Sequence, residues 1–233
     1  MPFETDTIAE LAIANPGVIP ALEKLGIDFC CGGAATIEDA CRRAGVDPAQ
    51  VRELAAGPAK VTTRAWEKEP LTALVRFIVE THHVFTRDAM AALRPLAAKV
   101  SGKHGEAHPE TRAVEALVLR LAEDLGPHLL KEEKILFPYV ESLEEAARGE
   151  SCFGTVQNPI RMMMRQHEAV GEILAELRAT TGGYVAPPDA CASFQALYAG
   201  LRDLEADLHR HIHLENNILF PGALAVEEGR PRP

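Results

Sequence analysis

One sequence pattern, His-x3-Glu-x2-Ile-Leu-Phe-Pro, occurs twice in the chain, at residues 128–138 and at residues 211–221. In an α-helix, a His and a Glu four residues apart lie on the same face, about 6 Å apart along the axis. The helical segment before each copy carries one more histidine, His82 in the first case and His167 in the second. This duplication predicts two similar helical hairpins that pack face to face.

Four long segments with helical periodicity dominate the rest of the chain. Their edges are marked by Pro, Gly and Asn, and no alternation typical of strands competes with them. The segments lie at residues 70–101, 109–138, 159–181 and 189–221. The sequence therefore predicts an all-α fold, in which an up-down four-helix bundle over residues 70–225 is followed by a short tail at residues 226–233.

Residues 1–56 are predicted to form a small helical domain of their own. Thr36 followed by Asp39, and Asp47-Pro48 followed by Gln50, are typical of helix starts with a capping residue. Residues 57–69 begin with Gly-Pro and have no clear periodicity, which is typical of a linker. The predicted order is thus a small domain, a linker and a bundle.

The composition narrows the classes of partner. Lys and Arg total 24 against 34 Asp and Glu, a net charge of −10, so no basic surplus is present to neutralise nucleic-acid phosphates. No stretch approaches the roughly 18 apolar residues of a membrane span, and the first residues lack the features of a secretory signal. Five cysteines without a framework spacing favour a reducing, cytoplasmic environment.

Six His and Glu side chains share the apolar face of the four long segments. Along each segment the positions of this face recur at steps of three and four residues, and the His and Glu fall within the series. At about 1.5 Å per residue, the four histidines all lie roughly 12–18 Å from the same end of the bundle. The six residues predicted in the interior are His82, His128, Glu132, His167, His211 and Glu215.

This interior set predicts a metal site. Two ionised carboxylates in an apolar core are costly unless they are paired or bound to a metal, and no basic residue occupies the same face. Six ligands exceed the needs of one tetrahedral zinc but suit two ions that share bridging carboxylates. Ligand type alone permits iron or manganese, and we expect two iron ions.

The same helical phase places other histidines off the apolar face. His83, His209 and His213 are expected in solvent or behind the ligands, whereas the roles of His104 and His108 in a polar connection stay open. Gly126-Pro127 interrupts the second segment just before a predicted ligand, so a kink is expected there.

Cys30 and Cys31 are adjacent and are followed by two glycines. Flexible backbone and nearby amide donors are suited to lower the pKa of a thiol. The two cysteines are either a catalytic redox or metal-delivery pair or ordinary residues of a Gly-rich turn, and residue chemistry alone leaves both open. The isolated cysteines, which we interpret as structural, are Cys41, Cys152 and Cys191.

The segment Asp28-Phe29-Cys30-Cys31-Gly32-Gly33 resembles the amino-terminal Cys-Cys-Gly-Gly signature of the iron-sulfur cluster repair di-iron proteins, the RIC (repair of iron centres) family, which have a hemerythrin-like domain. The two His-x3-Glu-x2-Ile-Leu-Phe-Pro segments are similar to the iron motifs of that family. The resemblance covers nearly the whole chain and, by matching motif, implies the same six ligands. One departure is Gln166, where some members have an acidic residue before the histidine.

The resemblance implies a cytoplasmic bacterial protein, often a homodimer, with a non-haem, carboxylate-bridged di-iron centre. The implied function is repair of iron-sulfur clusters in client proteins damaged by nitric oxide or peroxide, with iron donation as one route. Two alternatives are a nitric oxide-reducing oxidoreductase at the same centre and a module that senses O2, nitric oxide or iron. The Cys-Cys domain favours repair, because a plain sensor would not need it. O2 carriage is disfavoured, because the oxygen-carrying hemerythrins have more histidines.

Overall fold

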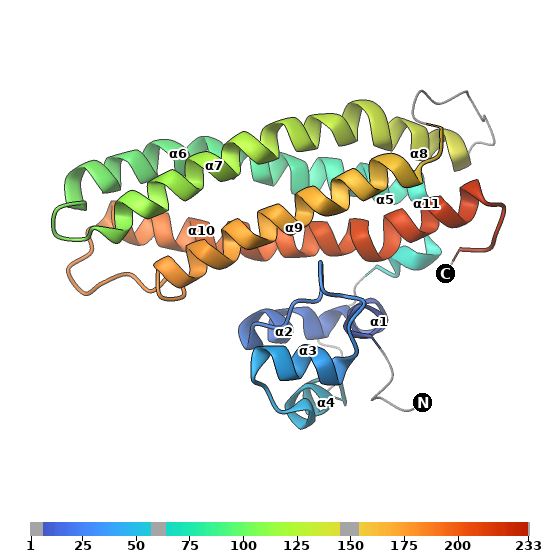
Figure 1. Ribbon diagram of the computed structural model, residues 1–233, viewed down its shortest axis with the longest axis horizontal. Helices are drawn as coiled ribbons and strands as arrows, with labels where there is room; N and C mark the ends of the chain where they lie inside the picture. The colour runs from blue at the N-terminus through green and yellow to red at the C-terminus, as the bar shows by residue number, and fades with distance from the viewer. Residues whose placement is uncertain (1–6, 57–63, 145–153, 233) are drawn as a thin grey trace.

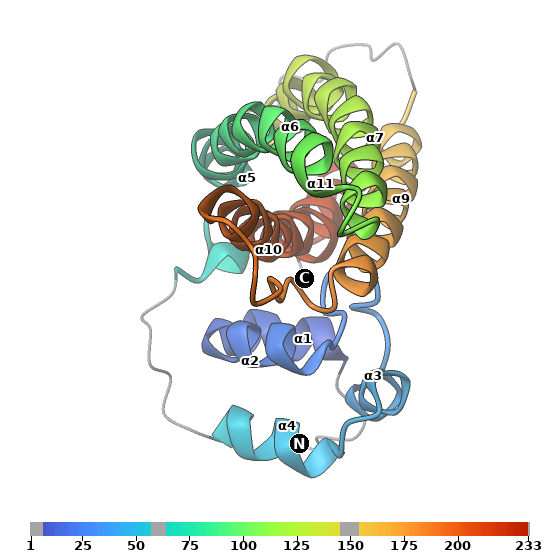
Figure 2. The same ribbon diagram turned by 90° about the vertical axis from the view of Figure 1, so that its left-hand side faces the viewer.

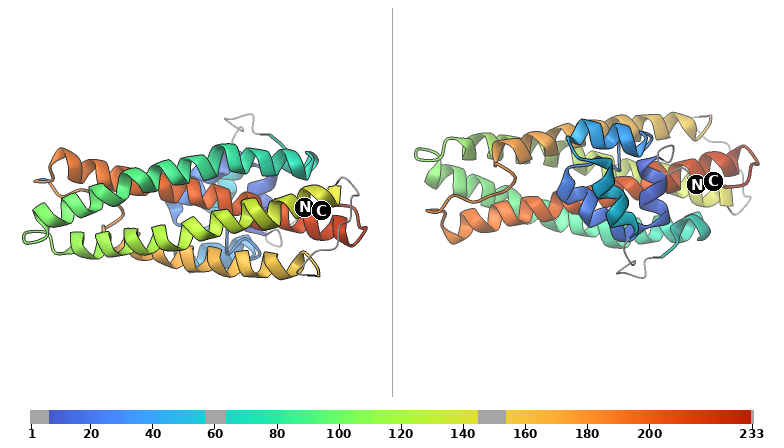
Figure 3. Two further views of the ribbon diagram at one scale, coloured as in Figure 1. Left: turned by 90° about the horizontal axis from the view of Figure 1, so that it is seen from above. Right: turned by 90° about the horizontal axis from the view of Figure 1, so that it is seen from below.

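The computed structural model describes residues 7–56, 64–144 and 154–232, and every regular element within these ranges is a helix. The predicted all-α class is therefore confirmed. Four antiparallel helical arms form an elongated bundle, and a group of short helices lies against one side of it (Figure 1). Figure 2, which looks along the bundle, shows the four arms around a common interior. Figure 3 shows that the short helices cover the middle of the bundle rather than either end.

Each arm of the bundle is a run of consecutive helical elements. The first arm joins α5 (Leu71–Phe77), a π-helical turn (Ile78–His83) and α6 (Val84–His104). The second arm joins α7 (Glu110–Lys131), a π-helical turn (Glu132–Leu136) and α8 (Phe137–Glu144). The third is α9 (Gln157–Thr180), and the fourth joins α10 (Ala192–Leu214), a π-helical turn (Glu215–Leu219) and α11 (Phe220–Glu227). Three of the four arms thus contain a π-helical turn.

Two of these π-helical turns stand directly before a Phe-Pro pair. Pro138 and Pro221 have no amide N–H, and their rings would clash with the carbonyl four residues earlier in an unbroken α-helix. A π-helical turn widens the backbone locally, so that the chain can continue as α8 and α11. Pro127 behaves differently, because α7 continues through it to Lys131. The kink expected at Gly126-Pro127 stays a prediction.

The interior of the bundle consists of two apolar clusters with a polar layer between them. One cluster lies toward the α6–α7 connection and includes Leu121 and Leu174. The other lies toward α8 and α11 and includes Leu74 and Phe137. The His and Glu side chains that separate the two clusters are therefore shielded from water along the bundle axis.

The small domain has an apolar core of its own. Its helices are α1 (Ile8–Ala14), α2 (Ile19–Leu25), α3 (Ile37–Ala44) and α4 (Pro48–Ala56), and their core includes Ile8, Leu22 and Ile37. The Asp39 amide donates to Thr36 Oγ1 at 3.2 Å, and the Ala49 amide donates to Asp47 Oδ1 at 2.9 Å. Both predicted helix starts are therefore confirmed.

The connection between the two parts is described only at its end. Residues 57–63 of the predicted linker, like Cys152, lie outside the described residues. Trp66, at the start of the 3-10 turn Trp66–Lys68, is buried against the bundle with its ring centroid 4.6 Å from that of Phe77. Within the described ranges, no helix has the length and apolar character needed to cross a membrane.

Candidate metal centre

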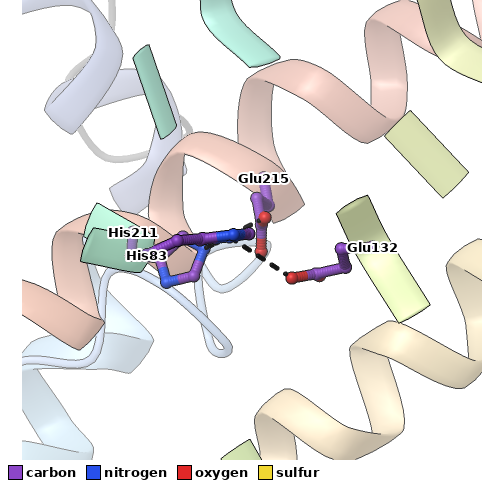
Figure 4. Close-up of side chains that lie close together, drawn as sticks. All are labelled: His83, Glu132, His211 and Glu215. Atoms are coloured by element: carbon purple, nitrogen blue, oxygen red, sulfur yellow. Dashed lines mark hydrogen bonds and ion pairs between the residues drawn. The ribbon is translucent and has the colours of Figure 1, made fainter. Parts of the chain in front are cut away.

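A layer of six buried side chains crosses the bundle at the π-helical turns. Their ligand atoms form two sets, and within each set these atoms all lie within 4.8 Å of one another. One set is His83, Glu132, His211 and Glu215 (Figure 4), and the other is His128, Glu132, His167 and Glu215. Both glutamates belong to both sets, and both are fully buried.

Each glutamate divides its two oxygens between the two sets. Glu132 Oε1 lies 3.2 Å from His128 Nε2, whereas its Oε2 lies 3.5 Å from His83 Nε2. Glu215 Oε2 lies 3.2 Å from His167 Nε2, whereas its Oε1 lies 3.1 Å from His211 Nε2. A carboxylate with one oxygen in each of two adjacent sites has the arrangement of a bridging ligand.

The structure places His83, and not His82, in this layer. The sequence predicted His82 from the regular phase of an α-helix, but the π-helical turn Ile78–His83 adds a residue to the turn and rotates the next position inward. His82 is also buried, yet its Nδ1 lies 3.0 Å from Asp207 Oδ1 and its ring stacks on that of His211 at a centroid distance of 5.7 Å. His82 therefore packs behind the layer, where the sequence had placed His83.

Hydrogen bonds at Nδ1 fix the orientation of three of the four histidines. Nδ1 lies 2.7 Å from Glu133 Oε1 in His83, 3.0 Å from Gln166 Oε1 in His128, and 2.9 Å from Asn216 Oδ1 in His167. Because these oxygens accept, each Nδ1 carries the proton and each Nε2 presents a lone pair to the layer. Gln166 thus orients His128 through a neutral amide oxygen.

The Nε2 atoms of the four histidines face one another in two pairs. His83 Nε2 lies 3.2 Å from His211 Nε2, and His128 Nε2 lies 3.1 Å from His167 Nε2. Both oxygens of Glu132 and Oε2 of Glu215 are buried without a hydrogen-bond partner. Lone pairs and orphaned carboxylate oxygens that converge on two points fit a pair of bound cations.

The charge balance of the layer requires positive charge as well. Burial alone would lower the pKa of His167, but its contacts with Glu132 and Glu215 outweigh burial and raise that pKa to about 10. Burial would raise the pKa of Glu215, and nearby His211 and His167 instead hold it well below its usual range. The two buried carboxylates thus favour positive charge at this level of the bundle, and bound metal ions would supply it.

The small domain reaches the bundle through the loop that carries the two cysteines (Figure 1). Phe29 is buried, and its ring centroid lies 5.5 Å from that of His213 on α10. The Asn217 side-chain amide donates to the Phe29 carbonyl at 3.1 Å. Burial lowers the pKa of His213 to about 4, so this histidine is neutral and belongs to the contact between the two parts. His209 lies beside the same phenyl ring. The sequence left open whether His209 and His213 lie in solvent or behind the ligands, and the structure places both against the small domain.

Asp28 organises the backbone around the two thiols. Its Oδ1 accepts from the amides of Cys30 and Cys31, both at 3.0 Å, and the two sulfur atoms are 4.0 Å apart. Cys30 is 5% exposed, whereas Cys31 is more accessible and lies against Gly171 of α9, one helical turn beyond His167. A cavity of about 450 Å³ between the small domain and α9 is lined by both cysteines. The pair thus lies next to the arm that holds His167, although its sulfur atoms are not part of either metal-ligand set.

We expect Gly33→Ala to weaken this docking. A Cβ at Gly33 would lie 2.8 Å from Asn217 Oδ1 and 3.0 Å from both Ala9 Cβ and the Phe29 carbonyl, so the loop must move away from the π-helical turn Glu215–Leu219. Overpacking of this kind costs about 1–3 kcal/mol, measurable as a lower midpoint of thermal unfolding together with faster alkylation of Cys30. Gly126→Ala is the control, because nothing lies within 4 Å of the added methyl group. Equal behaviour of the two variants would contradict the contact.

The remaining two histidines lie far from the layer. His104 and His108 are found at the α6–α7 connection, where their ring centroids lie 5.4 and 5.5 Å from that of Phe194. His104 ends α6, some twenty residues beyond His83, which corresponds to roughly 30 Å along the helix. Neither histidine can contribute to the same centre.

Comparison with known proteins matches both parts of the chain. The family model of the hemerythrin HHE cation binding domain matches residues 74–223, and the model described as a domain of unknown function, DUF542, matches residues 4–56. The iron-sulfur cluster repair protein YtfE of Yersinia pseudotuberculosis serotype IB is 35% identical over 97% of this chain and 100% of its own length. The protein of the same name from Musicola paradisiaca is 34% identical over the same shares. The buried His and Glu cluster agrees with a cation-binding domain and is suited to iron. This chain therefore belongs to the hemerythrin family and, with its additional amino-terminal domain, to the family of the YtfE iron-sulfur cluster repair proteins.

Proposed function

We propose that this protein repairs iron-sulfur clusters damaged by nitrosative or oxidative stress and that it does so with a non-haem di-iron centre. His83 and His211 would hold one iron, His128 and His167 would hold the other, and Glu132 and Glu215 would each offer one oxygen to both. The bound irons supply one-electron redox chemistry and exchangeable iron. The clients are cytoplasmic iron-sulfur proteins damaged by nitric oxide or peroxide, and the working form is a homodimer.

One observation carries the repair function for this chain, namely the position of the thiol pair. A sensor or an oxidoreductase needs only the bundle, yet the small domain presents Cys31 against the arm that carries His167. The two sulfur atoms and Asp28 form a compact group beside an open cavity. Thiolates are the soft ligands that iron and iron-sulfur clusters prefer. The pair is therefore suited to exchange iron or electrons between the bundle and a client.

The two thiols have different roles in this exchange. The hydrogen bond with Cys30 lowers the pKa of Cys31, whereas the same contact and burial raise the pKa of Cys30 well above its usual range. The pair therefore readily forms one thiolate, on the more accessible sulfur, and resists the loss of its second proton. Cys31 is the nucleophile or first ligand, and Cys30 donates a hydrogen bond to it until a client or metal arrives.

The double variant Cys30→Ser, Cys31→Ser tests this proposal. Because no cysteine belongs to the two metal-ligand sets, iron content should stay at about two per chain while repair of an oxidised iron-sulfur enzyme falls at least about tenfold. The measurement compares iron content and the recovery of client activity with those of the intact chain. Substitution is cleaner than removal of the small domain, because removal would uncover His213 and Asn217.

Cys191→Ser is the matched control, because it removes one thiol at the remote end of the bundle and should change neither quantity. Undiminished repair by the double variant would show that Cys30 and Cys31 are ordinary turn residues. Loss of iron would show that they contribute to the metal centre. Steady turnover of nitric oxide with an electron donor, in the absence of any client, would favour the oxidoreductase alternative.

A metal analysis combined with optical and Mössbauer spectra tests the identity of the ions. The proposal predicts about two irons per chain in a carboxylate-bridged pair. A stoichiometry near one, or manganese or zinc in the protein as isolated from cells, would contradict the di-iron assignment without affecting the geometry described above.

A further inference from the structure

A second thiol with a histidine partner lies at the end of the bundle that carries the α6–α7 connection. Cys191 immediately precedes α10, and His104 is the last residue of α6. His104 Nε2 lies 3.2 Å from Cys191 Sγ, although the two residues are 87 positions apart in the chain. The sequence had suggested a structural role for this cysteine, but its partly exposed sulfur forms a Cys–His pair.

The neighbourhood of this sulfur is electropositive. Cys191 is the N-cap residue of a long helix, where unpaired amides and the helix dipole favour an anion. The amides of Phe194 and Ser193 lower the pKa of the Cys191 thiol more than burial raises it, and Lys103 and Lys99 add to the effect. Cys41, which is fully buried in the small domain, has its pKa raised instead.

The pair opens into a cavity of its own. This cavity of about 190 Å³ is lined by Lys99, Lys103, His104, Cys191 and Ser193, among others. Lys99 Nζ donates to Ser193 Oγ at 3.0 Å, which holds one ammonium group over the first turn of α10. On the other side, His108 is fixed by Asp189 Oδ2, 3.0 Å from its Nε2. A nucleophilic sulfur, a base and two cations thus surround one small opening.

We propose that Cys191 is a site of thiol–disulfide exchange with anionic low-molecular-weight disulfides, the chemical class of glutathione disulfide. The two lysines bind the carboxylates of the disulfide, and this binding brings its sulfur–sulfur bond to Cys191 Sγ. The site is independent of the metal centre and of the proposed repair function, because it lies roughly 30 Å from His83 along α6.

The exchange balances without any further reactant. His104 accepts the thiol proton, and the Cys191 thiolate attacks one sulfur of the disulfide. A new sulfur–sulfur bond forms between Cys191 and that half, and the other half leaves as a thiolate, which takes up the proton from His104. The protein thiol is oxidised to the level of a mixed disulfide, and the small disulfide is reduced to one thiol. A free thiol of the same class reverses the reaction.

The test uses the full-length chain carrying Cys30→Ser and Cys31→Ser, so that the other accessible thiol pair does not compete. The protein is treated at pH 7 with glutathione disulfide or with cystamine, a disulfide of opposite charge. Peptide mapping by mass spectrometry then follows the adduct on each remaining cysteine. Cys191 should react about tenfold faster with glutathione disulfide than a small model thiol does, while Cys41 stays unmodified in the folded protein.

Two variants separate the parts of the site. Lys99→Gln with Lys103→Gln should slow glutathione disulfide about three- to tenfold and leave the cystamine rate equal or higher. His104→Ala should slow both reagents, with circular dichroism as the check on folding. Equal rates for the two disulfides with the parent protein, or a Cys191 rate no higher than that of the model thiol, would overturn the proposal.

Discussion

Replacing Glu132 with glutamine is expected to empty both metal positions at once. Glu132 contributes one oxygen to each ligand set, and both oxygens are buried with no hydrogen-bond partner. The amide supplies neither the second donor oxygen nor the negative charge. The iron content should therefore fall from about two per chain to well below one. Removing a residue that only orients a ligand typically weakens metal affinity ~10–100-fold, and the loss of Glu132 should weaken it more.

The fold itself should survive this change. Glutamine has nearly the same volume and removes a charge that is costly to bury without a metal, so the far-ultraviolet circular dichroism spectrum should be unchanged. Glu123→Gln, on the exposed side of α7 in the same arm, is the control and should keep its iron. Retention of both irons in the Glu132 variant would remove the basis for a shared bridging carboxylate.

His83→Ala and His82→Ala are expected to have opposite results, although the two residues are adjacent. His83 Nε2 faces His211 and Glu132, so its loss should remove the iron held by that set and leave at most about one per chain. His82 contacts Asp207 and the face of the His211 ring, so its loss should keep about two irons, with affinity reduced no more than about tenfold. Iron analysis and titration of the metal-free protein measure both effects.

Comparing these two variants also shows whether the first arm is a regular α-helix or contains a π-helical turn before the ligand. A regular α-helix predicts that His82→Ala is the damaging change, whereas the π-helical turn predicts His83→Ala. Loss of iron in the His82 variant with retention in the His83 variant would show that the first arm is an unbroken α-helix in the metal-bound protein. Glu133→Gln should lower the iron content less than His83→Ala does, since Glu133 Oε1 orients His83 from 2.7 Å and contributes no ligand.

Sequence reasoning located five of the six residues that the structure brings together, because the segments carrying them keep a regular helical phase up to the ligand. His128, Glu132, His211 and Glu215 precede or begin a π-helical turn, and His167 lies in the uninterrupted α9, so the phase counted from the preceding residues still holds. These assignments depended on the steps of three and four residues and on the repeated motif. The ligand roles themselves remain predictions that the iron measurements above would test.

The first arm differs because its π-helical turn comes before the ligand. Beyond Ile78–His83 every inward position is displaced by one residue. Thr86 and Met90 are buried, whereas Phe85, which lies three residues after His82 and would face inward in a regular α-helix, is 38% exposed. The other two π-helical turns could be predicted from the Phe-Pro pair that follows each of them. No such proline follows the first turn, so its sequence contains no indication that the helix phase shifts there.

The contact between the two parts was missed for another reason. The periodicity of a helix shows which of its faces is apolar and carries no information on which loop meets which surface. The loop of Cys30 and the histidines of α10 are nearly two hundred positions apart, so only the folded chain brings them together. His213 appeared off the apolar face because the surface it meets belongs to the small domain.

The polar layer between the two apolar clusters has a consequence for cooperativity. In the metal-free protein the two halves of the bundle are joined across a layer whose buried carboxylates repel each other, and each half has its own apolar contacts. Bound metal would join the four arms at that level and turn the halves into a single unfolding unit, with a gain in stability set by mass action. A protein that released its iron would then be left with a loosened middle, directly beneath the loop that carries the thiols.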